Sequence, residues 1–395
     1  MQGRDGNICS DCVETAYHYI QQYVGVEAPP STTKKASQPI NLQSVPKPLA
    51  IKEYLDQYII GQDDAKRVLS VAVYNHYKRL SLTPDMAKRD KEVEIEKSNI
   101  IMVGSTGTGK TLLARTIAKL LDVPFTIVDA TVFTEAGYVG EDVESILSRL
   151  LQAADFDLER AERGIVFIDE IDKIARKSDN PSITRDVSGE GVQQAMLKLL
   201  EGSVVNVPPK GGRKHPDQDY IHVDTSHILF ICGGAFDGIE RKIAQRLGSH
   251  TVGYDSVQNA RKIDTSDLMR YIQPQDLKSF GLIPEIIGRL PVLTYLNPLS
   301  REALSRILIE PKNSIIKQYE RLLEMDGIAL TFETEALDYI VDKAVEYKLG
   351  ARGLRSIVEA IMTEAMFELP SSTQKSFVVT KAYAKEQISK TNSLQ

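Results

Sequence analysis

The segment Gly104–Thr111, with the sequence GSTGTGKT, constrains the fold of this chain more than any other feature. Two glycines five positions apart, followed by lysine and threonine, are typical of a loop whose backbone N–H groups surround phosphate oxygens. An apolar run at residues 99–103 precedes the loop, and a helical pattern at residues 110–121 follows it. The segment therefore predicts a strand, a phosphate-binding loop and a helix whose N-terminus faces the phosphates.

The residue types in this loop indicate which side chains contact phosphate and metal. Lys110 supplies a cation to the β- and γ-phosphates, and Thr111 offers a hydroxyl to Mg²⁺. We therefore predict ATP and Mg²⁺ as cofactors. The predicted nucleotide-binding residues of the loop are Ser105, Thr106, Gly107, Thr108, Gly109, Lys110, Thr111 and Leu112.

A second motif, Ile165–Glu170, is an apolar strand that ends in two carboxylates. Open α/β sheets bind their ligands at the carboxyl ends of the strands, which is where these acids would lie. Asp169 suits Mg²⁺ coordination, and Glu170 suits activation of the attacking water. Alone the motif is also compatible with a surface turn. Downstream of a phosphate-binding loop it predicts hydrolysis rather than nucleotide binding alone.

Phosphoryl transfer also requires positive charge near the transition state, and two arginines are candidates. Arg289 lies just before a change of sequence character at Asn297-Pro298, and Arg352 opens a predicted helix beyond it. An arbitrary arginine would more often form a surface ion pair. We predict catalytic roles for Lys110, Glu170, Arg289 and Arg352.

The order of predicted elements indicates an α/β fold with a parallel sheet flanked by helices. Further short apolar strands are predicted at residues 125–129, 164–169 and 228–232, with helical segments between them. A smaller, mainly helical α+β domain should follow. In it we expect a long helix from Ser300 towards Met325, a strand at 328–332, helices at 333–347 and 354–369, and a polar end that frays from Ser371. The predicted domains are 49–298 and 299–395, after a linker at 29–48 and an N-terminal remnant at 1–28 that contains a short helix, Val13–Tyr23.

Composition excludes several classes of protein. The net charge is −6 and no basic excess is present, so a dedicated nucleic-acid binder is not expected. No apolar run approaches the roughly 20 residues of a spanning helix, so no membrane association is expected. Three cysteines are too few for a disulfide framework, and no signal-peptide layout is present, so we expect a cytoplasmic protein.

The motifs of this sequence, taken together, resemble those of the ClpX family, the AAA+ P-loop unfoldases that work with the ClpP peptidase. The resemblance runs from about Pro48 to Leu369 and includes residues 173–193. It rests on these separated motifs: Tyr58–Gln62, Gly104–Thr111, Gly137–Gly140, Phe167–Asp172, Arg213–His215, Gly281–Pro291 and Gly350–Arg355.

The resemblance implies a homohexameric ring that unfolds tagged proteins and passes them to a ClpP-type peptidase, with adaptors as further partners. It implies that Arg289 reaches a neighbour's nucleotide, that Arg352 senses the nucleotide of its own subunit, and that Ile59 and Ile60 lie near the adenine. Pore loops would contact substrate through Tyr138, Val139, Arg213, Lys214 and His215, with a further loop at 176–190.

The chain departs from the family pattern in two places. The family begins with a zinc module of two C-x-x-C pairs, whereas only Cys9 and Cys12 are present here, and Cys232 cannot replace a pair. A closed zinc site needs four ligands, so this half-site does not support Zn²⁺ binding, and we expect the chain to begin inside that module. The peptidase-docking loop reads Val252-Gly253-Tyr254 in place of Ile-Gly-Phe, which keeps its apolar character.

Three other classes of protein share parts of this pattern. An HslU-like unfoldase would carry a long insertion after the Asp-Glu strand, and residues 172–191 are too few to hold it. An AAA+ DNA motor would need a basic groove and a DNA-binding domain. A nucleotide-gated scaffold that does not turn over would not need Glu170 and Arg289.

Overall fold

The computed structural model describes residues 45–81, 95–134, 141–175, 189–208, 220–249, 267–347 and 350–392. All described residues belong to one unit of the chain, Leu42–Gln395. The predicted helix Val13–Tyr23 therefore lies outside the described residues.

A five-stranded sheet forms the centre of the first part of this unit. Its strand order is β2-β3-β6-β1-β7, and each neighbouring pair is parallel. The strands are β1 (Ile100–Val103), β2 (Phe125–Asp129), β3 (Ile165–Asp169), β6 (Leu229–Gly234) and β7 (Val292–Tyr295). All residues of β1 and β6 are buried, as continuous apolar strands require when helices cover both faces. The predicted α/β fold is confirmed.

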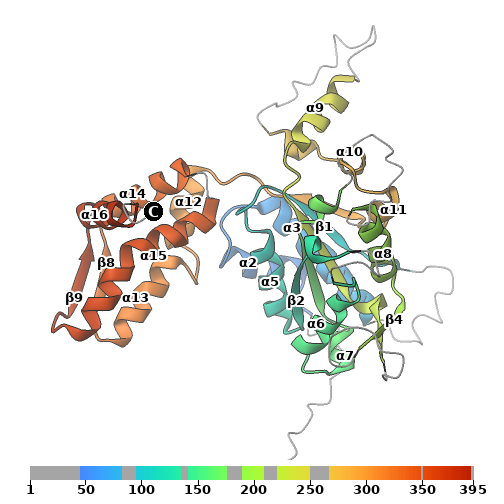
Figure 1. Ribbon diagram of the computed structural model, residues 1–395, viewed down its shortest axis with the longest axis horizontal. Coiled ribbons are helices and arrows are strands. Elements are labelled where there is room, and N and C mark those ends of the chain that lie inside the picture. Colours follow the sequence, from blue (N-terminus) through green and yellow to red (C-terminus); the bar gives the residue numbers. More distant parts are fainter. Residues whose placement is uncertain are drawn as a thin grey trace, which may run out of the picture. The chain divides into compact units, whose positions relative to one another are not determined.

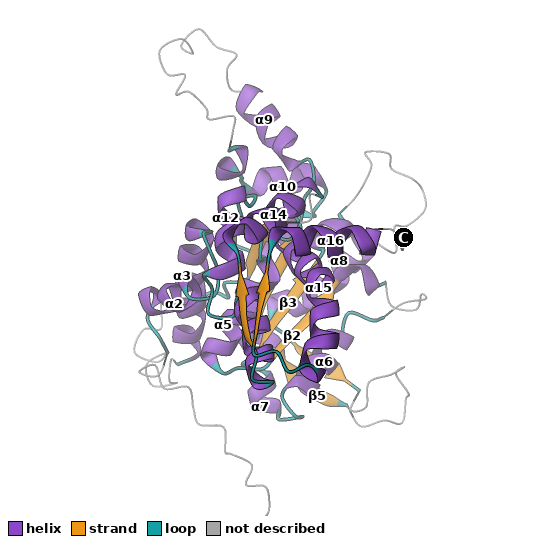
Figure 2. Cartoon of the chain, turned by 90° about the vertical axis from the view of Figure 1, so that its left-hand side faces the viewer, coloured by secondary structure: helices purple, strands orange, loops and turns teal. Residues whose placement is uncertain are grey.

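Helices cover the sheet, with α5 and α8 on opposite sides of it in Figure 1. Figure 2 shows β2 and β3 side by side among these helices. The helices of this part are α2 (Pro48–Asp56), α3 (Asp63–Leu80), α5 (Lys110–Leu121), α6 (Ser145–Ala153), α7 (Leu158–Ala161), α8 (Glu190–Glu201), α9 (Ile239–Ser249), α10 (Pro274–Phe280) and α11 (Pro284–Arg289), with short 3₁₀ turns η2 (Ala130–Val132), η3 (Ile171–Ile174), η4 (Thr225–His227) and η5 (Leu268–Tyr271).

A separate two-stranded sheet also belongs to this first part. β4 (Val204–Val207) and β5 (Ile221–Asp224) pair antiparallel, with Val207 opposite Ile221. Val205, Val207 and Val223 are buried on one face, while Val204 and His222 are exposed, so the pair shows the alternation of a strand with one covered face.

The second part has its own apolar core. It contains α12 (Arg301–Ile309), α13 (Ile315–Met325), β8 (Ala329–Phe332), α14 (Thr334–Glu346), α15 (Gly350–Glu368), η6 (Leu369–Ser371), β9 (Ser376–Val379) and α16 (Lys381–Asn392). β8 and β9 pair in parallel, and Ile340, Val358 and Ile361 are fully buried in a cluster that all these helices share. This matches the smaller α+β architecture that we predicted.

Two predictions in this part are wrong. The single helix from Ser300 towards Met325 is two helices, because Pro311 lacks the N–H that a helix interior needs and its ring clashes with the preceding turn. The stretch from Ser371 to Asn392 does not fray. It forms β9 and α16, and burial of Val379 and Ala384 fixes them to the core.

Candidate nucleotide site

The phosphate-binding loop joins the end of β1 to the start of α5, as predicted. A Cβ atom at Gly104 would lie 3.0 Å from both Cβ and the carbonyl oxygen of Leu296, so a larger residue would crowd the place where the loop passes the end of β7. Gly107 and Gly109 have φ of 84° and 105°, in the left-handed region that glycine adopts without strain. The Thr108 hydroxyl donates to Ser105 O at 2.8 Å and closes the loop.

Lys110 lies inside this loop. Its Nζ donates to Gly104 O and, at 3.1 Å, to Ser105 O, and the residue is 7% exposed. Burial lowers the pKa of the Lys110 ammonium, while the negative charges of Asp169 and Asp172 oppose that shift. The cation is therefore held where phosphate oxygens would replace carbonyls as its partners.

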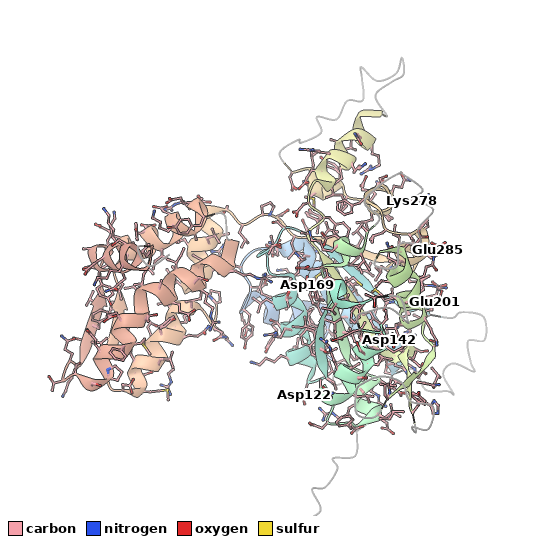
Figure 3. The ribbon with its side chains drawn as sticks, in the orientation of Figure 1. Asp122, Asp142, Asp169, Glu201, Lys278 and Glu285 are labelled. Carbon is pink, nitrogen blue, oxygen red and sulfur yellow. The ribbon has the colours of Figure 1, made fainter. Side chains whose placement is uncertain are left out.

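The two predicted metal ligands come from neighbouring elements. Thr111 Oγ1, in the first turn of α5, donates to Asp169 Oδ2 at 3.2 Å, and Asp169 ends β3 (Figure 3). A hydroxyl and a carboxylate at this distance are a donor set that Mg²⁺ accepts together with phosphate oxygens and water. The residues present therefore fit Mg²⁺–ATP.

Glu170 has a left-handed backbone, with φ of 58°, which is unusual for a non-glycine residue. Its N–H donates to Asp169 Oδ1 at 3.0 Å, and its side chain is exposed whereas Asp169 is half-buried. Strained backbone of this kind is found at functional positions, where the surrounding structure holds it. The turn separates the two adjacent carboxylates, as different roles in metal binding and water activation require.

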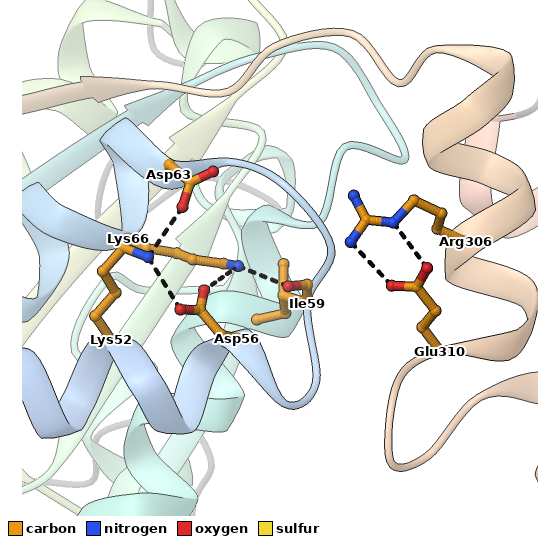
Figure 4. Close-up of polar contacts among 7 residues, drawn as sticks. All are labelled: Lys52, Asp56, Ile59, Asp63, Lys66, Arg306 and Glu310. Carbon is orange, nitrogen blue, oxygen red and sulfur yellow. Dashed lines mark hydrogen bonds and ion pairs between the residues drawn. The ribbon is translucent and has the colours of Figure 1, made fainter.

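The segment before α3 is fixed by buried polar contacts. Ile59 and Ile60 are buried, and the carbonyl of Ile59 accepts from Lys66 Nζ at 2.6 Å. Lys66 is 2% exposed and also contacts Asp56 at 2.7 Å (Figure 4). The Gln62 side chain donates to the carbonyl of Asn297 at 2.8 Å and accepts from its N–H at 2.9 Å. The sequence did not single out this amide clamp, because its partners are 235 positions apart.

The two candidate arginines occupy different surroundings. A Cβ atom at Gly350, which begins α15, would lie 3.5 Å from Thr106 O, so the first turn of α15, which contains Arg352, lies against the loop of its own chain. The charge of Arg352 accordingly contributes to the lowered pKa of Lys110. Arg289 ends α11 and pairs with Glu201, at 2.9 Å from Nη2 to Oε1. In Figure 3 Glu201 lies well apart from Asp169. The distance between the two residues in space is at least as large as their separation in this view. The structure thus brings Arg352, and not Arg289, to the chain's own phosphate loop.

Several predicted site residues lie outside the described residues. These are Tyr138 and Val139, the basic group Arg213, Lys214 and His215, the docking residues Val252, Gly253 and Tyr254, and the cysteines Cys9 and Cys12. Their roles stay predictions, and so does the absence of Zn²⁺ binding. Within the described ranges, no group of three or more His, Cys, Asp or Glu side chains could hold a metal ion.

Cys232 is the free cysteine of the described residues, and it is buried in β6. Burial raises the pKa of its thiol to about 12. This thiol therefore serves as a small apolar group. None of the helices within the described residues has the length and apolar character to cross a membrane.

Comparison with known proteins gives two family matches. Residues 95–293 match the AAA domain (Cdc48 subfamily), and residues 299–380 match the C-terminal, D2-small domain of ClpB protein.

Close relatives extend over nearly the whole chain. The ATP-dependent Clp protease ATP-binding subunit ClpX of Bacteroides thetaiotaomicron is 70% identical over 392 residues, which is 99% of this chain and 93% of that protein. The protein of the same name from Porphyromonas gingivalis is 64% identical over 396 residues, 100% of this chain and 94% of that protein. The one from Treponema denticola is 51% identical over 377 residues, 95% and 87% respectively.

The family matches, the relatives and the geometry of the phosphate-binding loop all indicate a protein that binds and hydrolyses ATP. The chain is an ATPase and is not itself a peptidase. The resemblance drawn from separated motifs is confirmed, since identities of this size extend far beyond the motifs themselves. The chain belongs to the ClpX family of ATP-binding subunits of ATP-dependent Clp proteases, which carry an AAA domain.

Proposed function

We propose that the chain forms a homohexameric ring that unfolds tagged proteins and threads them through its centre into a ClpP-type peptidase, acting as a chaperone when the peptidase is absent. Residues 49–298 and 299–395 would be the large and small domains of the motor. The relatives are named as subunits of an ATP-dependent Clp protease, which supports this assignment.

The observation that carries the proposal concerns the base of the predicted pore loop. Thr134 N–H donates to Glu141 O and Glu141 N–H donates to Val132 O, both at 3.2 Å. Residues 135–140, with Tyr138 and Val139, therefore leave and re-enter the described structure at one point. Glu141 also pairs with Arg149 of α6 at 2.7 Å, which ties this base to a helix of the core.

The basic segment at residues 209–219 has a similar base. It leaves the end of β4 and returns at the start of β5, where Val207 and Ile221 are partners in an antiparallel pair. Two segments that we predict to contact substrate thus both start from closed, core-anchored ends.

The chain's own residues divide the work of hydrolysis. Mg²⁺–ATP, when bound, supplies a phosphoanhydride bond whose hydrolysis releases free energy. Lys110 and the loop N–H groups hold phosphate oxygens, and Thr111 and Asp169 offer oxygen ligands to the metal. Glu170 would accept the proton of the attacking water, and an arginine would offset developing charge. Arg352 suits the nucleotide of its own subunit, and Arg289 that of a neighbour.

The test follows the fluorescence of a stably folded reporter that carries an unstructured recognition tag, with this protein, ATP and no peptidase. We expect fluorescence to be lost only when ATP is present. The Tyr138→Ala variant should hydrolyse ATP yet leave the reporter folded. As a matched control, Tyr347→Ala replaces an exposed tyrosine at the end of α14 and should unfold the reporter normally.

Two results would contradict the proposal. Undiminished unfolding by Tyr138→Ala would remove the assigned role of the pore loop. Steady reporter fluorescence with every tag tried, combined with ATP hydrolysis that DNA stimulates, would favour a DNA motor instead. Peptidase docking is tested separately, because Tyr254→Ala should reduce degradation by added ClpP-type peptidase without reducing unfolding.

A further inference from the structure

The ion pair between Arg289 and Glu201 joins the ends of two helices that are far apart in the sequence. Arg289 ends α11 and Glu201 ends α8. Nε and Nη2 of Arg289 both donate to Oε1 of Glu201, at 3.2 and 2.9 Å. Because the guanidinium is a rigid planar fork, engaging its Nε–Nη2 edge fixes its plane and directs the Nη1 end away from Glu201.

A single buried amide fixes the backbone under both partners. Asn99, 1% exposed, donates from Nδ2 to Leu200 O at 3.1 Å and to Arg289 O at 3.0 Å. Its Oδ1 accepts from the N–H of Phe230, in β6, at 3.3 Å. Leu200 precedes Glu201, so the main chain at both members of the ion pair is anchored to the same point beside β1.

Stability alone does not explain this arrangement. The side chains of Arg289 and Glu201 are 52% and 45% exposed, and exposed pairs contribute about 0–1 kcal/mol. The pair also lies apart from Asp169 and hence from the phosphate site of its own chain (Figure 3). The buried amide of Asn99 thus supports a surface ion pair that adds little stability and lies away from the chain's own nucleotide site. Such an arrangement is suited to directing the Nη1 end of Arg289 outward.

We propose that Glu201 is a positioning residue that orients Arg289 towards the nucleotide of the neighbouring subunit. The inference rests on the proposed function, in which Arg289 acts across a subunit interface of the ring. Glu201 binds the Nε–Nη2 edge and leaves the Nη1 end to donate to phosphate oxygens. Orientation before hydrolysis reduces the entropy lost in the transition state, and it acts on the rate more than on ATP binding.

The first test compares steady-state ATP hydrolysis by wild type, Glu201→Ala and Glu201→Gln. We expect kcat to fall about 3- to 10-fold for Glu201→Ala, with KM for ATP changed less than about 2-fold. Glu201→Gln keeps an acceptor oxygen without the charge and should lie between the two. Tm should stay within about 2 °C of wild type, because the pair adds little stability.

A second readout does not depend on turnover. In the hydrolysis-deficient Glu170→Gln background, we measure the release of a fluorescent ATP analogue by stopped flow. An arginine held on the neighbour's phosphates slows release, so adding Glu201→Ala should shorten the residence time, by less than about 2-fold in keeping with the small change expected in KM. Adding Glu201→Ala to a Glu170→Gln, Arg289→Ala protein should change nothing further, because the residue through which Glu201 acts is gone.

The matched control is Glu324→Ala, which removes another exposed Arg–Glu pair, with Arg321 on α13, and should hydrolyse as wild type. Wild-type kinetics for Glu201→Ala beside a slow Arg289→Ala protein would overturn only the role of Glu201. So would an effect of Glu201→Ala that persists without Arg289. Wild-type hydrolysis by Arg289→Ala would overturn both this inference and the assignment of Arg289 in the proposed function.

Discussion

Three basic side chains hold the turn Thr225–His227, which connects β5 to β6. Lys97 donates to the carbonyl of Thr225 at 2.8 Å, Arg79 to that of Ser226 at 2.7 Å, and His76 Nε2 lies 3.0 Å from that of His227. Burial, joined by the charges of Arg79 and Lys97, lowers the pKa of His76 to about 3. His76 is therefore neutral in the folded protein at physiological pH.

This histidine makes stability depend on pH. Its pKa is lower in the folded state, about 3, than the ordinary 6.5, so the unfolded chain binds the proton more readily between these values. Stability contributed by neutral His76 is complete above pH 6.5 and is lost as the pH falls towards 3, by about 2 kcal/mol at pH 5. His76→Gln should lose less stability on acidification. Denaturant unfolding at pH 7 and pH 5 measures this, and an equal loss in both proteins would contradict it.

The site residues that could be predicted from sequence are those whose contacts are local. Lys110 and Thr111 follow the glycines of their own loop, so their spacing fixes their chemistry. Gln62, Asn99 and Glu201 contact partners 88 to 235 positions away, and although Gln62 ends the motif Tyr58–Gln62, nothing in the sequence indicates which residues these three contact. Tertiary structure is what brings each of these residues to its partner.

At the scale of elements, buried apolar runs were predictable and short or partly exposed ones were not. The predicted starts and ends of β1, β2, β3 and β6 agree with the structure to within two residues. β7 was missed because its four residues follow Pro291 closely and three of them are only half-buried. β9 was missed although Phe377-Val378-Val379 is an apolar run, because polar residues surround it.

The helices on either side of the predicted docking residues in the sequence, α9 and α10, are joined by a well-buried ion pair. Arg246 of α9 donates through Nε and Nη2 to both carboxylate oxygens of Asp276, at 2.9 and 3.0 Å. Asp276 is 2% exposed and also accepts from Gln273 N–H at 2.8 Å, where α10 begins. One carboxylate therefore caps α10 and fixes α9, the helix that leads towards Val252–Tyr254.

Removing this carboxylate should be costly. We expect Asp276→Ala to lower the free energy of unfolding by about 3 kcal/mol, because the guanidinium of Arg246 would stay largely buried without the carboxylate that neutralises its charge. Asp338→Ala removes an exposed partner of Arg301 and should cost less than about 1 kcal/mol. Urea titration of both variants makes the comparison, and equal losses would show that burial does not determine the cost.

At the scale of the whole molecule, the proposed ring divides each catalytic site between two chains. One chain would supply the phosphate loop with Lys110, and its neighbour would supply Arg289. Arg352, by contrast, lies near Lys110 of its own chain. Removing Arg289 should therefore impair ATP hydrolysis at the site of the neighbouring subunit, whereas removing Arg352 should impair hydrolysis at the site of the same subunit.

Mixed rings test this division. Lys110→Met and Arg289→Ala proteins should each hydrolyse ATP very slowly alone. Mixed rings contain interfaces that combine an intact loop with an intact Arg289, so hydrolysis should rise at least about tenfold above either protein alone. Mixing Lys110→Met with the double variant Arg289→Ala, Arg352→Ala should restore nothing, because Arg352 acts within its own chain. No recovery in the first mixture would contradict action across the interface.

The amide of Gln62 has a mechanical consequence. Asn297 follows β7, which pairs with β1 in parallel, and Leu296 N–H extends that ladder to Val103 O at 2.8 Å. Tension along the chain at Asn297 would load these hydrogen bonds together, in shear, and not one after another as in unzipping. The two hydrogen bonds between Gln62 and Asn297 would bear part of this force at the point where the chain leaves the sheet. A connection of this kind is stiff, so force applied at Asn297 would be transmitted to the sheet with little extension of the chain.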